Sequence, residues 1–153
     1  MSTSERMAEL GIELPPVPAP LASYVPARRV GDLVFSSGQL PTRDGRPVYT
    51  GKLGQDLTVE QGQEAARVAA LNCLAAVAAE IGSLDEIEAV VKLTGYVASA
   101  PGFVDQPLVA NGASTLLEQV FGEAGKHARA AVGVAELPRG VPVEVELIVC
   151  VRS

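Results

Sequence analysis

The sequence is poor in the residues that build metal centres and disulfide scaffolds. Among its 153 residues are one histidine, His127, and two cysteines, Cys73 and Cys150. A zinc site of the Cys₂His₂, Cys₄ or His₃ type cannot be assembled from one such chain. A Ser-His-Asp triad would have to use His127. Two separated cysteines are typical of a reducing compartment, so we expect neither a metal site nor a disulfide framework.

Aromatic and basic residues are also scarce. Tryptophan is absent and aromatic residues make up 4% of the chain, so the core must be built from alanine, valine, leucine and isoleucine. Twelve basic residues stand against 18 acidic ones, which gives a formal net charge of −6. Binding to nucleic acid depends on neutralising phosphates with lysine and arginine. We therefore expect no nucleic-acid partner.

Long apolar segments are missing. The longest uninterrupted apolar run is residues 73–79, far shorter than a membrane span. Residues 1–16 lack the basic region followed by an apolar one that marks a signal peptide. We expect a cytoplasmic protein with no membrane partner. Apolar residues nevertheless make up 48% of a chain of one-domain length, which is typical of a folded globular domain.

Proline is concentrated in the N-terminal part of the chain. Five of the eleven prolines lie in residues 15–26. Proline and the residue before it both disfavour the helix interior, so this stretch is predicted to be extended. The chain thus divides into a proline-rich N-terminal arm, residues 1–23, and a single domain, residues 24–153.

Hydrophobic periodicity and turn residues predict the elements of the domain. Residues 27–38 are typical of a hairpin with its turn at Gly31-Asp32. Thr58 and Gln61 form a capping box at the start of a helix that Gly82 ends. The other predicted elements are a short edge strand at 47–50, a strand at 88–99, a helix at 104–121, a turn at 122–126, and strands at 128–137 and 141–151.

This order predicts an α+β fold in which two helices cover one face of a mixed sheet. The last strand is apolar on both sides. Its valines and Leu147 alternate on one face, and Ile148 and Cys150 lie on the other. Because two helices cannot cover both faces, the second face should be buried against another subunit.

Arg129 is the most conspicuous candidate for binding. It begins a strand that is otherwise built of small apolar residues, where a guanidinium needs an anionic partner. One interpretation is that Arg129 reaches solvent or pairs with Glu144 or Glu146. The other is that it binds a substrate carboxylate through two parallel hydrogen bonds.

Two further positions also leave two interpretations open. Glu144 and Glu146 share one face of the last strand, which is either solvated or, at a subunit boundary, supplies a general base for water. Tyr24 follows the proline-rich stretch and either anchors the arm or lines a pocket.

Three segments together resemble the Rid family (RidA/YjgF type, also labelled endoribonuclease L-PSP). They are Ser-Gly-Gln-Leu-Pro at 37–41, Ala-Arg-Ala-Ala-Val-Gly-Val-Ala-Glu-Leu-Pro at 128–138 and Val-Glu-Val-Glu at 143–146. The resemblance covers roughly residues 20–152 and extends to the order of the elements.

The resemblance implies a chorismate-mutase-like fold (bacillary type) that forms a homotrimer with clefts between subunits. It also implies cofactor-independent hydrolysis of reactive 2-enamine or 2-imine acids to 2-oxo acids and ammonia. A non-catalytic trimer that binds a small carboxylate in the same cleft is the alternative. A ribonuclease or translation inhibitor is disfavoured by the net charge of −6 and the single histidine.

Carried over by position, the resemblance assigns Arg129 to the substrate carboxylate and Glu144 to the hydrolytic water. The residues that it implies for substrate binding are Tyr24 of a neighbouring subunit, Ser37, Gly38, Asn111 and Ala131. The sequence departs from the family pattern at His127, where a proline is usual, and at Ala131, where a cysteine is frequent. These departures reshape the cleft.

Overall fold

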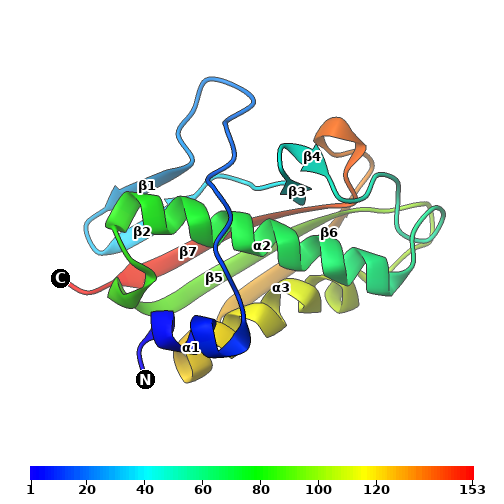
Figure 1. The fold of residues 1–153 in the computed structure, drawn as a ribbon. Coiled ribbons are helices and arrows are strands. Elements are labelled where there is room, and N and C mark those ends of the chain that lie inside the picture. Colours follow the sequence, from blue (N-terminus) through cyan, green and yellow to red (C-terminus); the bar gives the residue numbers. More distant parts are fainter.

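The computed structural model describes residues 1–153, and its main element is a five-stranded mixed sheet (Figure 1). The strand order is β1-β2-β7-β5-β6. All neighbours are antiparallel except β5 and β6, which are parallel. The strands are β1 (Ala27–Val30), β2 (Leu33–Ser36), β7 (Val143–Val151), β5 (Ile87–Ala98) and β6 (Ala128–Val134).

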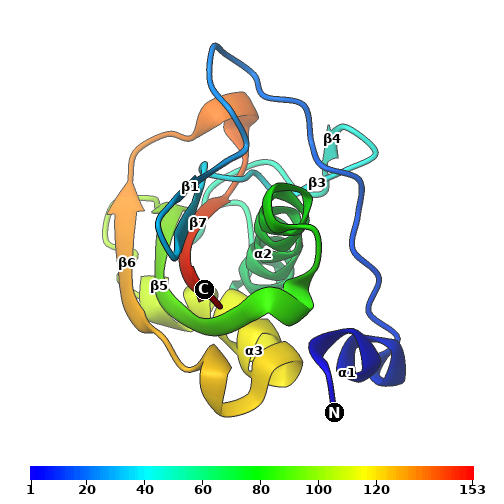
Figure 2. The same cartoon turned by 90° about the vertical axis from the view of Figure 1, so that its left-hand side faces the viewer.

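Two long helices, α2 (Val59–Ile81) and α3 (Gln106–Phe121), cover one face of this sheet (Figures 1 and 2). The predicted capping box is confirmed, since Thr58 and Gln61 each accept a hydrogen bond from the other's backbone N–H. Valines at every second position of β7 are buried against the helices. The expected α+β architecture with two helices on one face is confirmed. No helix of the chain has both the length and the hydropathy to cross a membrane.

An N-terminal helix, α1 (Thr3–Leu10), was not predicted. It begins with a capping box between Ser2 and Glu5 and ends at Gly11 in the left-handed conformation (φ 70°). Met7 is only 6% exposed and belongs to the core. The backbone N–H and hydroxyl of Ser4 each donate to Asp85 at 2.9 Å. The beginning of the arm is therefore attached to the domain.

A small hairpin of β3 (Thr42–Arg43) and β4 (Arg46–Pro47) replaces the strand predicted at 47–50. Asp44 and Gly45 connect its strands with φ values of 55° and 77°. An Asp-Gly pair with two positive φ angles matches a two-residue type I′ turn.

The other differences from prediction lie at element ends. Strand β6 ends at Val134 rather than at 137, and a short 3₁₀ turn, η3 (Pro138–Gly140), leads into β7. Two further 3₁₀ turns precede β5 and β6, namely η1 (Leu84–Glu86) and η2 (Gly122–Gly125).

The opposite face of the sheet carries no helix in the chain (Figure 2). Leu33, Phe35 and Val132 expose 38%, 40% and 43% of their surface there. Phe35 lies opposite Ile148 and Leu33 opposite Cys150 across the β2–β7 pair. This apolar strip is called the open face below.

Helices α2 and α3 are in close backbone contact at Gly112. A Cβ at this position would overlap the backbone carbonyl oxygen of Gln63. We expect Gly112→Ala to lower the free energy of unfolding by about 1–3 kcal/mol, because backbone atoms must move apart. Denaturation by urea measures this change.

Gly95→Ala is the matched control. Its Cβ would lie 3.5 Å from the Cβ of Ala110, an ordinary contact. Equal destabilisation by the two substitutions would contradict the proposed close approach of the helices.

Candidate functional site

Arg129 projects from β6 toward helix α3. Its Nη1 donates to Asn111 Oδ1 at 2.8 Å and to Ser114 Oγ at 3.2 Å, and its Nη2 donates to the carbonyl oxygen of Pro107 at 3.2 Å. No carboxylate of the chain forms an ion pair with it. The interpretation that Arg129 pairs with Glu144 or Glu146 is therefore wrong.

These contacts hold the guanidinium in place without using all of its donors. An arginine side chain has five N–H groups, and three are used here. One N–H on Nη2 and the Nε–H remain. A planar carboxylate can accept two parallel hydrogen bonds from such a fork. The positive charge, the fixed position and the two free donors fit a carboxylate-binding group.

Ser114 connects Arg129 to His127, and the sequence analysis missed it. His127 Nδ1 lies 2.6 Å from the carbonyl oxygen of Gly125. A carbonyl can only accept, so Nδ1 carries a proton, and in the neutral ring Nε2 accepts from the Ser114 hydroxyl at 2.8 Å. Ser114 follows Asn111 by three residues, on the same side of the helix, which is the signal that could have revealed it.

Glu144 lies on the open side of the sheet. It alternates with the buried Val143 and Val145 and is itself half-buried. Burial, and to a lesser extent the nearby charge of Glu146, raises the pKa of Glu144 above its usual range. Its carboxylate receives no hydrogen bond from the chain, so it is free to accept one from water.

Glu146 is engaged instead. The hydroxyl of Tyr96 donates to Glu146 at 2.8 Å. This hydrogen bond, with burial, raises the pKa of Tyr96 to about 12. Of the two carboxylates on this face, Glu144 is therefore the one available as a base.

Gly38 lies against Glu144. A Cβ at position 38 would overlap the carboxylate of Glu144, so the Glu144 side chain would have to move to admit any other residue there. Ser37 instead holds the arm. Its hydroxyl donates to the carbonyl oxygen of Val25 at 2.5 Å, and its backbone N–H donates to the carbonyl oxygen of Pro26 at 2.8 Å. Tyr24 is 46% exposed, and its hydroxyl accepts from the backbone N–H of Leu21 at 3.3 Å.

The candidate residues thus fall into two groups. Arg129 and Asn111 lie together at the α3 side of edge strand β6, and Ala131 is two residues farther along that strand. Gly38 and Glu144 lie together on the open side. Within one chain, Arg129 and Glu144 lie on opposite faces of the sheet. No three His, Cys, Asp or Glu side chains are grouped to hold a metal ion.

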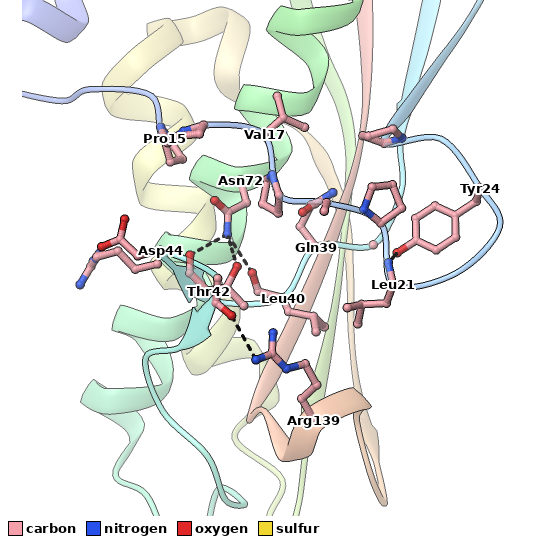
Figure 3. A pocket seen from close by; sticks show the side chains of 18 residues that line it. Pro15, Val17, Leu21, Tyr24, Gln39, Leu40, Thr42, Asp44, Asn72 and Arg139 are labelled. Atoms are coloured by element: carbon pink, nitrogen blue, oxygen red, sulfur yellow. Dashed lines mark hydrogen bonds between the residues drawn. The ribbon is translucent and has the colours of Figure 1, made fainter.

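A cavity of about 480 Å³ opens between the proline-rich stretch and the loop that leads to β3 (Figure 3). Tyr24 and Gly38 line it, whereas Arg129, Asn111 and Glu144 do not. Among the polar residues that also line it, and that the sequence analysis did not select, are Gln39, Asn72 and Arg139. Gln39 lies within the Ser-Gly-Gln-Leu-Pro segment, which could have revealed it, whereas Asn72 and Arg139 belong to no motif.

The fold and the two groups of residues define a small α+β protein of chorismate-mutase-like architecture. A family described as "YjgF/chorismate_mutase-like, putative endoribonuclease" matches residues 4–147. The chain belongs to this family, which confirms the resemblance found in the sequence.

Individual relatives agree with this assignment. Protein TCP17 of Trypanosoma cruzi is 49% identical over 144 residues, which are 94% of this chain and 90% of TCP17. The 2-iminobutanoate/2-iminopropanoate deaminase of Dermatophagoides farinae is 30% identical over 141 residues, 92% of this chain and 95% of that protein. The crystal structure of a "putative endoribonuclease" from Shewanella oneidensis is 34% identical, with a TM-score of 0.95 over 99% of this chain and 100% of that one.

The raised pKa of Glu144 has a consequence for stability. Because the folded state favours the protonated carboxyl, stability falls as pH rises from the unfolded to the folded pKa. We expect Glu144→Gln to raise the melting temperature at a pH above the folded-state pKa of Glu144, where the wild-type carboxylate is charged. The gain should vanish in acid, below both pKa values, where the wild-type side chain is also neutral.

Thermal unfolding at several pH values measures this difference. Glu88→Gln removes the same charge from an exposed position of β5 and serves as the control. If the rise in melting temperature caused by Glu144→Gln is independent of pH, or if Glu88→Gln produces the same rise, burial of the Glu144 charge is ruled out as its cause.

Proposed function

We propose that the protein hydrolyses reactive 2-imine and 2-enamine acids to 2-oxo acids and ammonia. The observation that carries the proposal is Arg129, a positioned guanidinium with two free donors and no anionic partner. A relative that is 30% identical over most of both chains is named as a deaminase of 2-imino acids, which supports this substrate class.

The proposed site needs more than one copy of the chain. Arg129 faces α3 and Glu144 faces the open side, so one protomer cannot present both to one small molecule. The open face also leaves Leu33, Phe35 and Val132 exposed, which favours burial against another subunit. We infer a homotrimer, the assembly that the family resemblance implies, with the clefts between its protomers.

In such a cleft, the substrate carboxylate binds to Arg129. This contact fixes the neighbouring carbon, which is the electrophile. Glu144 accepts a proton from water as the water oxygen bonds to that carbon, and this proton passes to the nitrogen to give a carbinolamine. The proton of the new hydroxyl then moves to the nitrogen as the C–N bond breaks, which releases ammonia and leaves the 2-oxo acid. The raised pKa of Glu144 makes it a stronger base than an ordinary carboxylate.

The assembly can be tested at the open face. We expect light scattering to give three times the 15.8 kDa mass of one chain. Phe35→Glu should shift the protein to a smaller species, because it places a charge in the proposed interface. Leu10→Glu introduces the same charge at an exposed apolar residue outside the open face, at the end of α1, and should leave the mass of the assembly unchanged. A wild-type protein that is monomeric at micromolar concentration would refute the proposed cleft.

The chemistry can be tested with imines generated in situ, by following 2-oxo acid formation. Arg129→Ala should weaken substrate capture by about 10- to 150-fold, the equivalent of one hydrogen bond to a charged group. Arg129→Lys should also be impaired, because an ammonium lacks the planar fork. Glu144→Gln should lower kcat more than it raises KM, since Glu144 acts on the water.

Arg46→Ala and Glu88→Gln remove the same charges from exposed positions and serve as controls. Wild-type activity in Arg129→Ala would show that the carboxylate binds elsewhere. A wild-type protein that binds 2-oxo acids but hydrolyses neither small nor bulky imines would instead be a carboxylate-binding protein without this activity.

A further inference from the structure

The cavity of about 480 Å³ shares Tyr24 and Gly38 with the residues implied for the cleft, but neither Arg129 nor Glu144 lines it. Gln39 forms an antiparallel bridge with Val145, so both side chains lie on the same, helix-covered side of the sheet. Gly38 and Glu144, one position earlier on each strand, face the open side. Helix α2 contributes Asn72 to the cavity, whereas Arg129 lies beside α3 at the opposite edge of the sheet.

The outer wall of the cavity is held at both ends. On the N-terminal side of this wall, Met7 is buried in the core and Ser4 is hydrogen-bonded to Asp85. On its C-terminal side, Ser37 donates hydrogen bonds to the carbonyl oxygens of Val25 and Pro26. Between these anchors four prolines and Leu21 supply an apolar lining (Figure 3). Because proline restricts the backbone, this wall is preorganised.

Two buried side chains in the cavity have unused hydrogen-bonding groups. Gln39 is 6% exposed, and its side-chain amide forms no hydrogen bond within the chain. Asn72 is 1% exposed: its Nδ2 donates to the carbonyl oxygens of Leu40 and Thr42, but its Oδ1 accepts nothing. No unpartnered nitrogen or oxygen of these side chains is fully buried, so the free groups can be reached from the cavity. The cavity therefore offers one free donor group and two free acceptors to a ligand.

The charge at the rim favours an anion. Arg43, Asp44 and Arg139 line the cavity, which leaves one excess positive charge, and no ion pair joins them. Arg139 uses one N–H on the carbonyl oxygen of Gly45 at 3.1 Å. Its backbone has a φ of 59°, a left-handed conformation that costs energy in a residue with a Cβ.

The geometry points to a second binding site, for a small carboxylate that also carries an N–H donor and an apolar side chain. A hydrophobic amino acid and its N-acyl derivative share this chemistry. The carboxylate would bind Arg139, the N–H would donate to Asn72 Oδ1 or to Gln39, and the apolar side chain would pack on the prolines.

Titration calorimetry of the full chain tests the proposal with four probes. L-leucine and N-acetyl-L-leucine carry all three features, and binding of either supports the site; the tighter of the two identifies its preferred form. L-leucinamide lacks the carboxylate and 4-methylpentanoate lacks the N–H, so both should bind at least about tenfold more weakly.

Two variants connect binding to the cavity. Gln39→Met and Arg139→Gly should each weaken binding by about tenfold or more. Gln39→Met should leave the melting temperature nearly unchanged, because the Gln39 side chain forms no hydrogen bond within the chain that would be lost and methionine is of similar size. Arg139 has a left-handed backbone conformation that glycine adopts without strain, so Arg139→Gly should also fold. Arg46→Ala removes one positive charge from the adjacent β4 without touching the lining and should bind as the wild type does.

Several results would overturn the proposal. One is the absence of binding of both leucine probes at millimolar concentration. Another is equal binding of 4-methylpentanoate, which would contradict the roles of Asn72 and Gln39. Loss of binding in Arg129→Ala, with normal binding in Arg139→Gly, would place the carboxylate in the cleft instead. Because these variants act on separate residues, the proposed deaminase activity stands or falls independently.

Discussion

Burial of one face of strand β7 under helices α2 and α3 determines where the candidate residues on this strand and on its neighbour at residues 38–39 lie. Alternate side chains of a strand face opposite sides. Because Val143, Val145 and Leu147 are buried in the core, Glu144 and Glu146 must face away from the helices. The same alternation places Gln39 beside Val145 and Gly38 beside Glu144. The hydrophobic core thus sorts the polar side chains into two separate environments.

Arg129 shows how the fold prepares a charged group without neutralising it. Neutral partners on α3 hold its guanidinium, namely Asn111, Ser114 and the carbonyl oxygen of Pro107. His127 Nε2 is hydrogen-bonded to the Ser114 hydroxyl. This contact orients the hydroxyl oxygen, which accepts a hydrogen bond from Arg129. The charge therefore remains available for an external anion, which is the physical basis of the proposed substrate binding.

The N-terminal residues contribute more than an extended leader. Helix α1 attaches them to the domain, and Ser37 fixes the chain again beyond the prolines. The stretch between these anchors encloses the cavity that contains Gln39 and Asn72. The unused hydrogen-bonding groups of these two amides are accessible from the cavity, where the proposed ligand would bind them.

The sequence by itself determined the local elements, the sheet-and-helix architecture and the family. The turn at Gly31-Asp32, the Thr58 capping box and the alternation in β7 depend on neighbours along the chain, so they could be predicted. Helix α1 has the same kind of local signal, in Ser2, Glu5 and Gly11, and was missed beside the prolines. The tertiary structure alone decided that Arg129 binds α3 rather than Glu144, and that residues 39, 72 and 139 meet in one cavity. These contacts join distant segments, and their partners follow from strand order and packing, which no local pattern of residues specifies.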